Sequence, residues 1–243
     1  WLRPEIISGL REVTGAIHAE GAAAGIQIGH CGNMSHKKIC GTTPISASSG
    51  FNFYSPTFVR GMKREELPEM ARAYGRAVHL AREAGFDAVE VHAGHGYLIS
   101  QFLSPYTNHR KDEYGGLLQN RMRFMEMVMN EVMTAAGSDM AVFVKMNMRD
   151  GFKGGMETDE TLQVAKRLLA LGAHALVLSG GFVSKAPMYV MRGAMPIRSM
   201  AYYMDCWWLK YGVRMFGKWM IPTVPFREAY FLEDALKFRA ALP

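Results

Sequence analysis

The chain has 243 residues, of which 49% are hydrophobic and 21% are charged. These values exclude a disordered, collagen-like or fibrous protein and indicate one large globular domain or two small ones. Three cysteines are too few for a disulfide framework, so we expect a reducing, cytoplasmic location. No uncharged apolar run reaches the ~20 residues that span a bilayer, and we expect no membrane partner. The net charge of +6 is spread along the chain without a basic stripe interleaved with aromatic residues, which argues against nucleic-acid binding.

One unit recurs four times: an amphipathic helix, a short loop that contains glycine, and an apolar strand. The predicted helices cover residues 4–20, about 64–84, about 119–136, and a stretch that starts at Thr158 or Asp159, either of which can cap it. The predicted strands cover residues 25–30, 86–92, 141–147 and 173–178. We expect loops and helices over residues 183–243.

Each predicted helix carries an apolar stripe at helical spacing, which we expect to face the core. The stripe of the first helix consists of Ile6, Ile7, Leu10, Val13 and Ile17. The stripe of the second consists of Leu67, Met70, Ala71, Tyr74, Val78 and Ala81. The third helix turns Phe124, Val128, Met129 and Val132 inward, and the fourth turns Leu162, Ala165, Leu168 and Leu169 inward.

Apolar strands that alternate with helices indicate a parallel sheet covered on both faces. The candidate folds are a doubly wound sheet and a (β/α)8 barrel. No Gly-x-Gly-x-x-Gly follows any of the strands, which weighs against a dinucleotide-binding domain. A closed barrel has eight strands and only four are found, so we expect residues 1–243 to form one partial barrel domain, part of a larger barrel. A complete small α/β sheet is the alternative.

The densest polar cluster, His92, His95 and Tyr97, follows the second strand. Strand C-termini and the loops after them carry the active sites of parallel α/β folds. Two imidazoles and a phenol there can bind an oxyanion and donate a proton. The alternatives are metal ligation and a structural loop, although His-x-x-His lacks the i, i+4 spacing of a zinc-binding helix.

A long polar loop over residues 102–116 is interpreted as a lid or, preferably, a structural element. Asp112 is expected to form a structural ion pair with Arg121 or Arg123. Near the first strand, His30, Cys31, His36 and Cys40 suggest a zinc site, although their spacing fits no common zinc pattern.

Gln27 and Lys145 are polar residues that lie within predicted apolar strands. A buried Gln27 requires a polar partner, either a cofactor or another side chain. Lys145 lies in the middle of the third strand, where a buried amine must be paired or functional. The structural alternative for Lys145 is a salt bridge to Glu90 on the neighbouring strand.

Taken together, these motifs resemble the Old Yellow Enzyme family of FMN-dependent ene reductases, also called NADH:flavin oxidoreductases. The resemblance is carried by Gln-Ile-Gly-His-Cys-Gly at 27–32, His-Ala-Gly-His-Gly-Tyr-Leu at 92–98, Phe-Leu-Ser-Pro-Tyr-Thr-Asn-His-Arg-Lys-Asp-Glu-Tyr-Gly-Gly at 102–116 and Asn-Arg-Met-Arg-Phe at 120–124. It implies a (β/α)8 barrel, of which this chain holds about strands three to six, with FMN at the C-terminal mouth.

The resemblance also implies residue roles. Gln27 would hydrogen-bond the pyrimidine edge of the flavin, and Lys145, where many members have Arg, would stabilise negative charge on the reduced flavin. His92 and His95 would hold the carbonyl oxygen of an α,β-unsaturated substrate, and Tyr97 would protonate its α-carbon. NADH or NADPH would supply the hydride, no metal is implied, and a homo-oligomer is left open.

Two other hypotheses remain at this stage. One is a flavin-free (β/α)8 lyase or aldolase that uses Lys145 as a Schiff-base amine. The other is a non-catalytic barrel remnant that only binds a partner.

Overall fold

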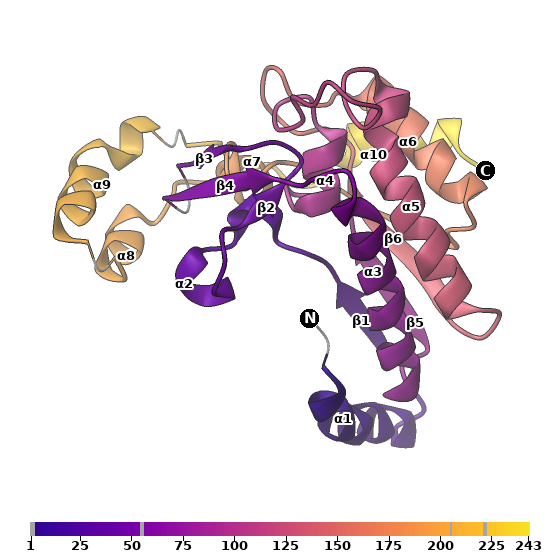
Figure 1. Cartoon of the computed structure of the whole chain (residues 1–243). Helices are drawn as coiled ribbons and strands as arrows, with labels where there is room; N and C mark the ends of the chain where they lie inside the picture. Colours follow the sequence, from indigo (N-terminus) through magenta and orange to yellow (C-terminus); the bar gives the residue numbers. More distant parts are fainter. Residues whose placement is uncertain (1–2, 54–55, 205, 221–222) are drawn as a thin grey trace.

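A four-stranded parallel sheet forms the centre of the computed structural model, which describes residues 3–53, 56–204, 206–220 and 223–243. The first two residues of the predicted domain and three short internal stretches lie outside the described residues. The sheet order is β1-β5-β6-β7, and each neighbouring pair is parallel (Figure 1). The strands are β1 (Gly25–Ile28), β5 (Ala88–His92), β6 (Ala141–Asn147) and β7 (Ala175–Ser179). All four were predicted, and the predicted bounds of β6 are confirmed.

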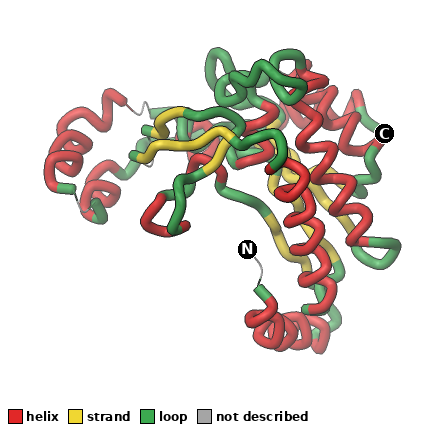
Figure 2. The backbone as a smooth tube through the Cα atoms, viewed as in Figure 1, coloured by secondary structure: helices red, strands yellow, loops and turns green. Residues whose placement is uncertain are grey.

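Three helices cover one face of this sheet (Figure 2). They are α3 (Glu66–Glu83), α5 (Leu118–Ala136) and α6 (Thr158–Ala170). The predicted stripes of α3 and α5 are entirely buried, as expected for helices that press an apolar face on a sheet. The cap predicted for α6 is wrong, because Thr158 is the first helical residue and its hydroxyl accepts a hydrogen bond from Arg149 at 2.9 Å. Glu157 takes the N-cap position without a side-chain bond.

The first helix departs from its prediction. A 3-10 turn over Pro4–Ile6 leads into α1 (Ile7–Ala19), and of the predicted stripe only Ile7 is buried. Val13 is 52% exposed. Leu10 and Ile17 are half-buried and Ile6 is exposed, so the helix, which contacts α3, is covered only in part.

A second, three-stranded sheet was not predicted. It lies between β1 and α3 in the sequence and has the order β2-β4-β3. Its strands are β2 (Ile45–Ser46), β3 (Gly50–Asn52) and β4 (Thr57–Gly61). Strands of two to five residues are too short to show an alternating pattern against a background of serine and glycine, which is why the sequence did not indicate them.

The remaining elements lie mainly at the carboxyl ends of the strands or beyond residue 183. They are a 3-10 turn at Gly32–Met34, α2 (Lys37–Cys40), α4 (Leu98–Leu103), α7 (Pro187–Met191), α8 (Ile197–Tyr202), α9 (Trp207–Met220) and α10 (Leu232–Ala241). Helices and loops after residue 183 were predicted. Across the described ranges, no helix is both long and apolar enough to cross a membrane.

The two faces of the parallel sheet differ in polarity. Side chains that point toward the helices, such as Val89, Val91 and Val144, are fully buried. The opposite face carries Glu90 and Lys145, both partly exposed, and an exposed Gln27. The expectations of strands apolar on both faces and of a buried Gln27 are therefore wrong for this chain: the face opposite the helices, which is the interior of a (β/α)8 barrel, is polar and open.

Candidate active site

Polar side chains from three neighbouring strands meet on the open face of the sheet. Gln27 is in register with Glu90, and His92 is in register with Lys145. Because Glu90 and His92 are two residues apart on β5, their side chains point to the same face. The Gln27 amide donates a hydrogen bond to Glu90 Oε1, and Lys145 Nζ lies 3.3 Å from the same oxygen. Glu90 thus holds an amide and an ammonium group side by side, and the predicted salt bridge to Lys145 is present.

The His92, His95 and Tyr97 side chains cluster at the carboxyl end of β5. The ring centroids of His92 and His95 are 5.0 Å apart, and those of His92 and Tyr97 are 4.8 Å apart. His92 is 4% exposed, and its buried Nδ1 has no hydrogen-bond partner among the residues that the structure describes. A buried nitrogen without a partner is costly in a folded protein, so its position in this cluster marks a place where a ligand oxygen can bind.

The turn after His92 is strained and closely packed. His95 has a φ of 57° and Gly96 a φ of 79°, both in the left-handed region. A Cβ at position 96 would come within 2.5 Å of the Phe182 ring, so only glycine fits there. His95 Nε2 and Ser179 Oγ lie 2.7 Å apart and share a hydrogen bond. The loop after β5 is thereby docked on the end of β7.

Burial lowers the pKa of His92 to about 3, and the nearby His95 and Lys145 act in the same direction. Burial and then the Lys145 charge also lower the pKa of His95, against a small opposing effect of Glu90. Both imidazoles are therefore neutral near pH 7. A neutral imidazole still has one N–H group that can donate a hydrogen bond to a substrate oxygen.

Asn147 was not singled out from the sequence, although it connects the three strand ends. Its Oδ1 accepts the backbone N–H of His95 at 2.9 Å. Its Nδ2 donates to Asp150 Oδ1 at 2.9 Å and to the Gly181 carbonyl at 2.8 Å. An asparagine two residues after a functional lysine on the same strand lies on the same face, and that spacing was the available signal.

Asp150 completes this buried network. Its second carboxylate oxygen accepts hydrogen bonds from the Ser104 hydroxyl at 2.7 Å and from the Met156 backbone N–H at 2.8 Å. Burial raises the pKa of Asp150, while these hydrogen bonds oppose that change. The network fixes the loops after β5, β6 and β7 relative to one another.

A fully buried Gln101 connects the loop after β1 to the same region. Its amide donates to the Gly96 carbonyl at 2.6 Å and to Asn33 Oδ1 at 2.8 Å, and its oxygen accepts the Asn33 backbone N–H at 3.1 Å. The loops that follow β1 and β5 are therefore held together by one side chain.

The long loop over residues 102–116 is structural, as the sequence favoured, but its ion pairing was predicted wrongly. Asp112 pairs with Arg110, at 2.5 Å from Nη2, rather than with Arg121 or Arg123. Arg121 instead pairs with Glu160 at the start of α6, and Arg123 contacts Asn120. Asp112 and Arg110 are two residues apart in one turn, so their contact forms locally, whereas α5 directs Arg121 toward α6.

The suggested zinc site is not formed. Among the described residues no group of three or more His, Cys, Asp or Glu side chains is placed to hold a metal ion. His36 Nδ1 accepts the Lys38 N–H at 3.2 Å, and Cys40 Sγ donates to the carbonyls of His36 and Thr42. These side chains form hydrogen bonds within their own loop and do not converge on a common centre.

Known proteins resemble this chain in sequence and in fold. The model of the NADH:flavin oxidoreductase / NADH oxidase family matches residues 3–205. A 4,4'-dithiodibutanoate disulfide reductase from Rhodococcus erythropolis is 38% identical over 97% of this chain and 59% of its own length. An NADPH dehydrogenase from Halalkalibacterium halodurans is 37% identical over 77% of this chain and 54% of its own length. The chain thus spans a little over half the length of these curated relatives.

Solved structures share the fold. A 2-naphthoyl-CoA reductase complex superposes with a TM-score of 0.71 at 26% identity, over 88% of this chain and 34% of that one. The old yellow enzyme homologue from Zymomonas mobilis superposes with a TM-score of 0.66 at 29% identity, over 73% of this chain and 53% of that one. The predicted fold class, part of a (β/α)8 barrel, is confirmed.

Proposed function

The chain belongs to the NADH:flavin oxidoreductase / NADH oxidase family, and we propose that the whole protein is an FMN-dependent ene reductase. It would pass hydride from NADH or NADPH through FMN to the activated C=C bond of an α,β-unsaturated carbonyl compound. The observation that carries this proposal is the register of His92 with Lys145 on one open face, with Gln27 and Glu90 in the adjacent row. These residues place a cation, a polar edge and a candidate oxyanion site on the same surface.

The residues present fit FMN. Gln27 and Lys145 are held by one carboxylate, Glu90, and face outward from the sheet where a planar ring can lie against them. The amide can both donate to and accept from the pyrimidine edge, and the ammonium group favours negative charge beside it. FMN, when bound, supplies the hydride acceptor and donor.

The two histidines would bind the substrate at its carbonyl group. The unpartnered Nδ1 of His92 and the ring of His95 would bind the carbonyl oxygen and stabilise the negative charge that develops on it. Because both rings are neutral, this stabilisation comes from hydrogen bonds in a partly buried site rather than from full charges. Lys145, in register with His92, adds a positive field across the same face.

Tyr97 would protonate the α-carbon after hydride reaches the β-carbon. The hydride and the proton together add the two hydrogens of a saturated carbonyl product, while NADH or NADPH becomes the oxidised nucleotide. The contact of the Tyr97 ring with the His92 ring supports this role, because it keeps the phenol beside the oxyanion site.

A Schiff-base lyase is less well supported. Such a mechanism needs a neutral amine as the nucleophile. The Glu90 carboxylate lies 3.3 Å from Lys145 Nζ, so this nitrogen is held in an ion pair instead of being free to attack a carbonyl carbon. Borohydride treatment in the presence of a carbonyl substrate would trap a Schiff base on Lys145 in a lyase, and we expect no such adduct.

A second candidate substrate class comes from the Rhodococcus erythropolis disulfide reductase, because the similarity to it extends over 97% of this chain. In that case NADH or NADPH and one proton would reduce an organic disulfide to two thiols, through the same flavin. We keep the enone as the first candidate, because the paired imidazoles are suited to a carbonyl oxygen.

The proposal is tested with the whole protein, purified and examined for bound flavin. We expect a yellow protein that oxidises NADH or NADPH faster when a cyclic enone is added, with 4,4'-dithiodibutanoate assayed in parallel. Turnover with the disulfide alone would favour the second candidate. A colourless protein that takes up no FMN on titration would contradict both and favour a non-catalytic barrel remnant.

We further propose that residues 1–243 belong to one barrel domain, that the partner is a small molecule rather than a nucleic acid, and that the protein is cytoplasmic. The three free cysteines, Cys31, Cys40 and Cys206, support a reducing location.

A further inference from the structure

We propose that the hairpin of α8 and α9 docks the protein on an anionic lipid surface. Figure 1 shows this hairpin projecting away from the parallel sheet and its helices. The inference goes beyond the proposed enzyme function, and it departs from our expectation of no membrane partner. That expectation rested on the length of apolar runs, which excludes a spanning helix but does not address a helix that lies in the interface.

The hairpin is a discrete appendage with a closed base. Gly193 and Val224 exchange two backbone hydrogen bonds, with N–O distances of 2.5 and 3.0 Å. The guanidinium of Arg192 lies 4.1 Å from the centroid of the Tyr230 ring and 5.0 Å from that of Tyr189. The family model matches residues 3–205 and ends before α9.

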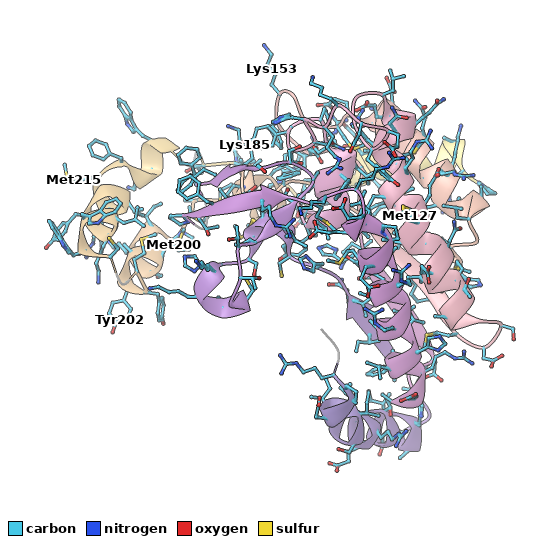
Figure 3. The ribbon with its side chains drawn as sticks, in the orientation of Figure 1. Met127, Lys153, Lys185, Met200, Tyr202 and Met215 are labelled. Carbon is cyan, nitrogen blue, oxygen red and sulfur yellow. The ribbon has the colours of Figure 1, made fainter. Side chains whose placement is uncertain are left out.

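One side of α9 packs on α8. Gly217 is buried, and a Cβ there would come within 2.8 Å of Ile197. The opposite side is broad, apolar and exposed: Trp219 is 93% exposed and Met215 is 73% exposed. The other exposed large apolar side chains of α9 are Trp207, Trp208, Tyr211 and Phe216. Figure 3 shows Met215 of α9 and Tyr202 of α8 at the outer edge of the hairpin.

A cationic band runs beside this apolar sector. Lys210, Arg214 and Lys218 follow one another at intervals of four residues and therefore lie along one side of the helix. Residues 193–220 contain these three cations and Arg198 but a single acidic residue, Asp205. The cations of this segment form a band of their own beside the aromatic sector and are not interleaved with it.

The charge identifies the kind of partner. Two copies of the hairpin would bring like charges together, which opposes a dimer through this surface. An amphipathic helix with Lys and Arg on one side and Trp and Phe on the other is suited to an anionic bilayer surface, where aromatic side chains enter the headgroup region and cations stay with the phosphates. The cytoplasmic leaflet, to which the proposed location gives access, has this charge.

The test uses the whole flavin-loaded protein and vesicles of phosphatidylcholine, with or without phosphatidylglycerol, in a co-sedimentation assay. We expect binding to the anionic vesicles only, weakened by salt, with a blue shift of tryptophan emission. Replacing two cations (Arg214→Glu with Lys218→Glu) should weaken binding at least ~30-fold, at about fivefold for each cation lost. The paired substitution Lys153→Glu with Lys166→Glu, exposed residues outside the hairpin, serves as the matched charge control.

A second variant tests the apolar sector. Trp208→Ser with Trp219→Ser should abolish the blue shift and the binding, while flavin content and turnover stay those of the unmodified protein. Absence of binding to anionic vesicles at low salt would overturn the inference. So would a dimer, detected by light scattering, that is lost in the tryptophan variant, because it would assign this face to a second copy. Since flavin content is measured separately, failure of the docking surface is distinguishable from failure of the enzyme proposal.

Discussion

Tyr97 is placed by its backbone as the residue before α4, with its ring against His92. If its phenol is the proton donor, Tyr97→Phe removes one O–H group and keeps the ring contact. We expect the oxidative half-reaction with an enone to slow by about 10²–10⁴-fold, the usual contribution of a positioned general acid. Stopped-flow measurement of both half-reactions in the whole protein checks this. Reduction of the flavin by NADH or NADPH should be nearly unchanged, and an equal loss in both half-reactions would refute the role.

His92 makes stability depend on pH. Its pKa is about 3 in the folded protein, whereas an unfolded histidine titrates near 6.5. Between these values the unfolded chain binds the proton and the folded chain does not, so the free energy of unfolding falls as pH falls, by at most ~1.4 kcal/mol per pH unit for this group. Above about pH 6.5 both states are neutral and this contribution to the slope disappears.

Urea unfolding at several pH values measures that slope. We expect His92→Asn to flatten the dependence between about pH 4 and pH 6. The matched control is His79→Asn, the same change at an exposed position on α3. A slope that is the same in all three proteins would show that His92 is not buried in its neutral form.

Three strands depend on one side chain for the arrangement of their ends. Asn147→Ala removes the acceptor of the His95 N–H group and the donor to Asp150 and to the Gly181 carbonyl. Leaving such buried groups unpaired costs ~1–3 kcal/mol each, so we expect a clear loss of stability and a higher KM for the enone as His95 moves. Thermal unfolding and steady-state kinetics of the whole protein provide the two readouts.

The control is Asn130→Ala, the same change on the exposed side of α5, where little effect is expected. If Asn147→Ala lowers stability without any change in KM, the residue supports the fold alone and does not position His95.

The helices that pack on the sheet were predictable because α3 and α5 repeat apolar residues at a period that only a helix satisfies. The short strands β2, β3 and β4 were not, since they hold two to five residues each. The cap of α6 was assigned one residue too late. The Thr158 hydroxyl accepts a hydrogen bond from Arg149, and no local sequence pattern indicates that contact. Local periodicity thus predicts long elements, and tertiary contacts decide their ends.

The site was predictable in part for a similar reason. A lysine within an apolar strand and two histidines at the end of another are unusual in sequence, so Lys145, His92 and His95 could be singled out. Asn147 was missed, although its place two residues after Lys145 on β6 put it on the same face. Ser179 could not be singled out, because polar residues at strand ends are common and only the register of β6 and β7 brings it to His95. The resemblance to a known family supplied roles that residue patterns alone left open.

At the scale of the whole molecule, the sheet has one face for stability and one for chemistry. The helices bury the side with Val89, Val91 and Val144. On the other side Glu90 contacts both Lys145 and Gln27, next to the two neutral imidazoles. The central claim is that a flavin lies against this second face. The positive charge of Lys145 would then stabilise the reduced, negatively charged flavin.

The reduction potential of FMN bound to the whole protein tests that claim most directly. Lys145→Met removes the cation and leaves Glu90 uncompensated, so we predict a potential more negative by ~30 mV or more, the equivalent of about 1.4 kcal/mol for a two-electron couple. Lys145→Arg, which keeps the charge, should stay close to the unmodified protein. A flavin whose potential is the same in the Met variant would contradict the account, because the amine would then lie too far from the ring to act on it.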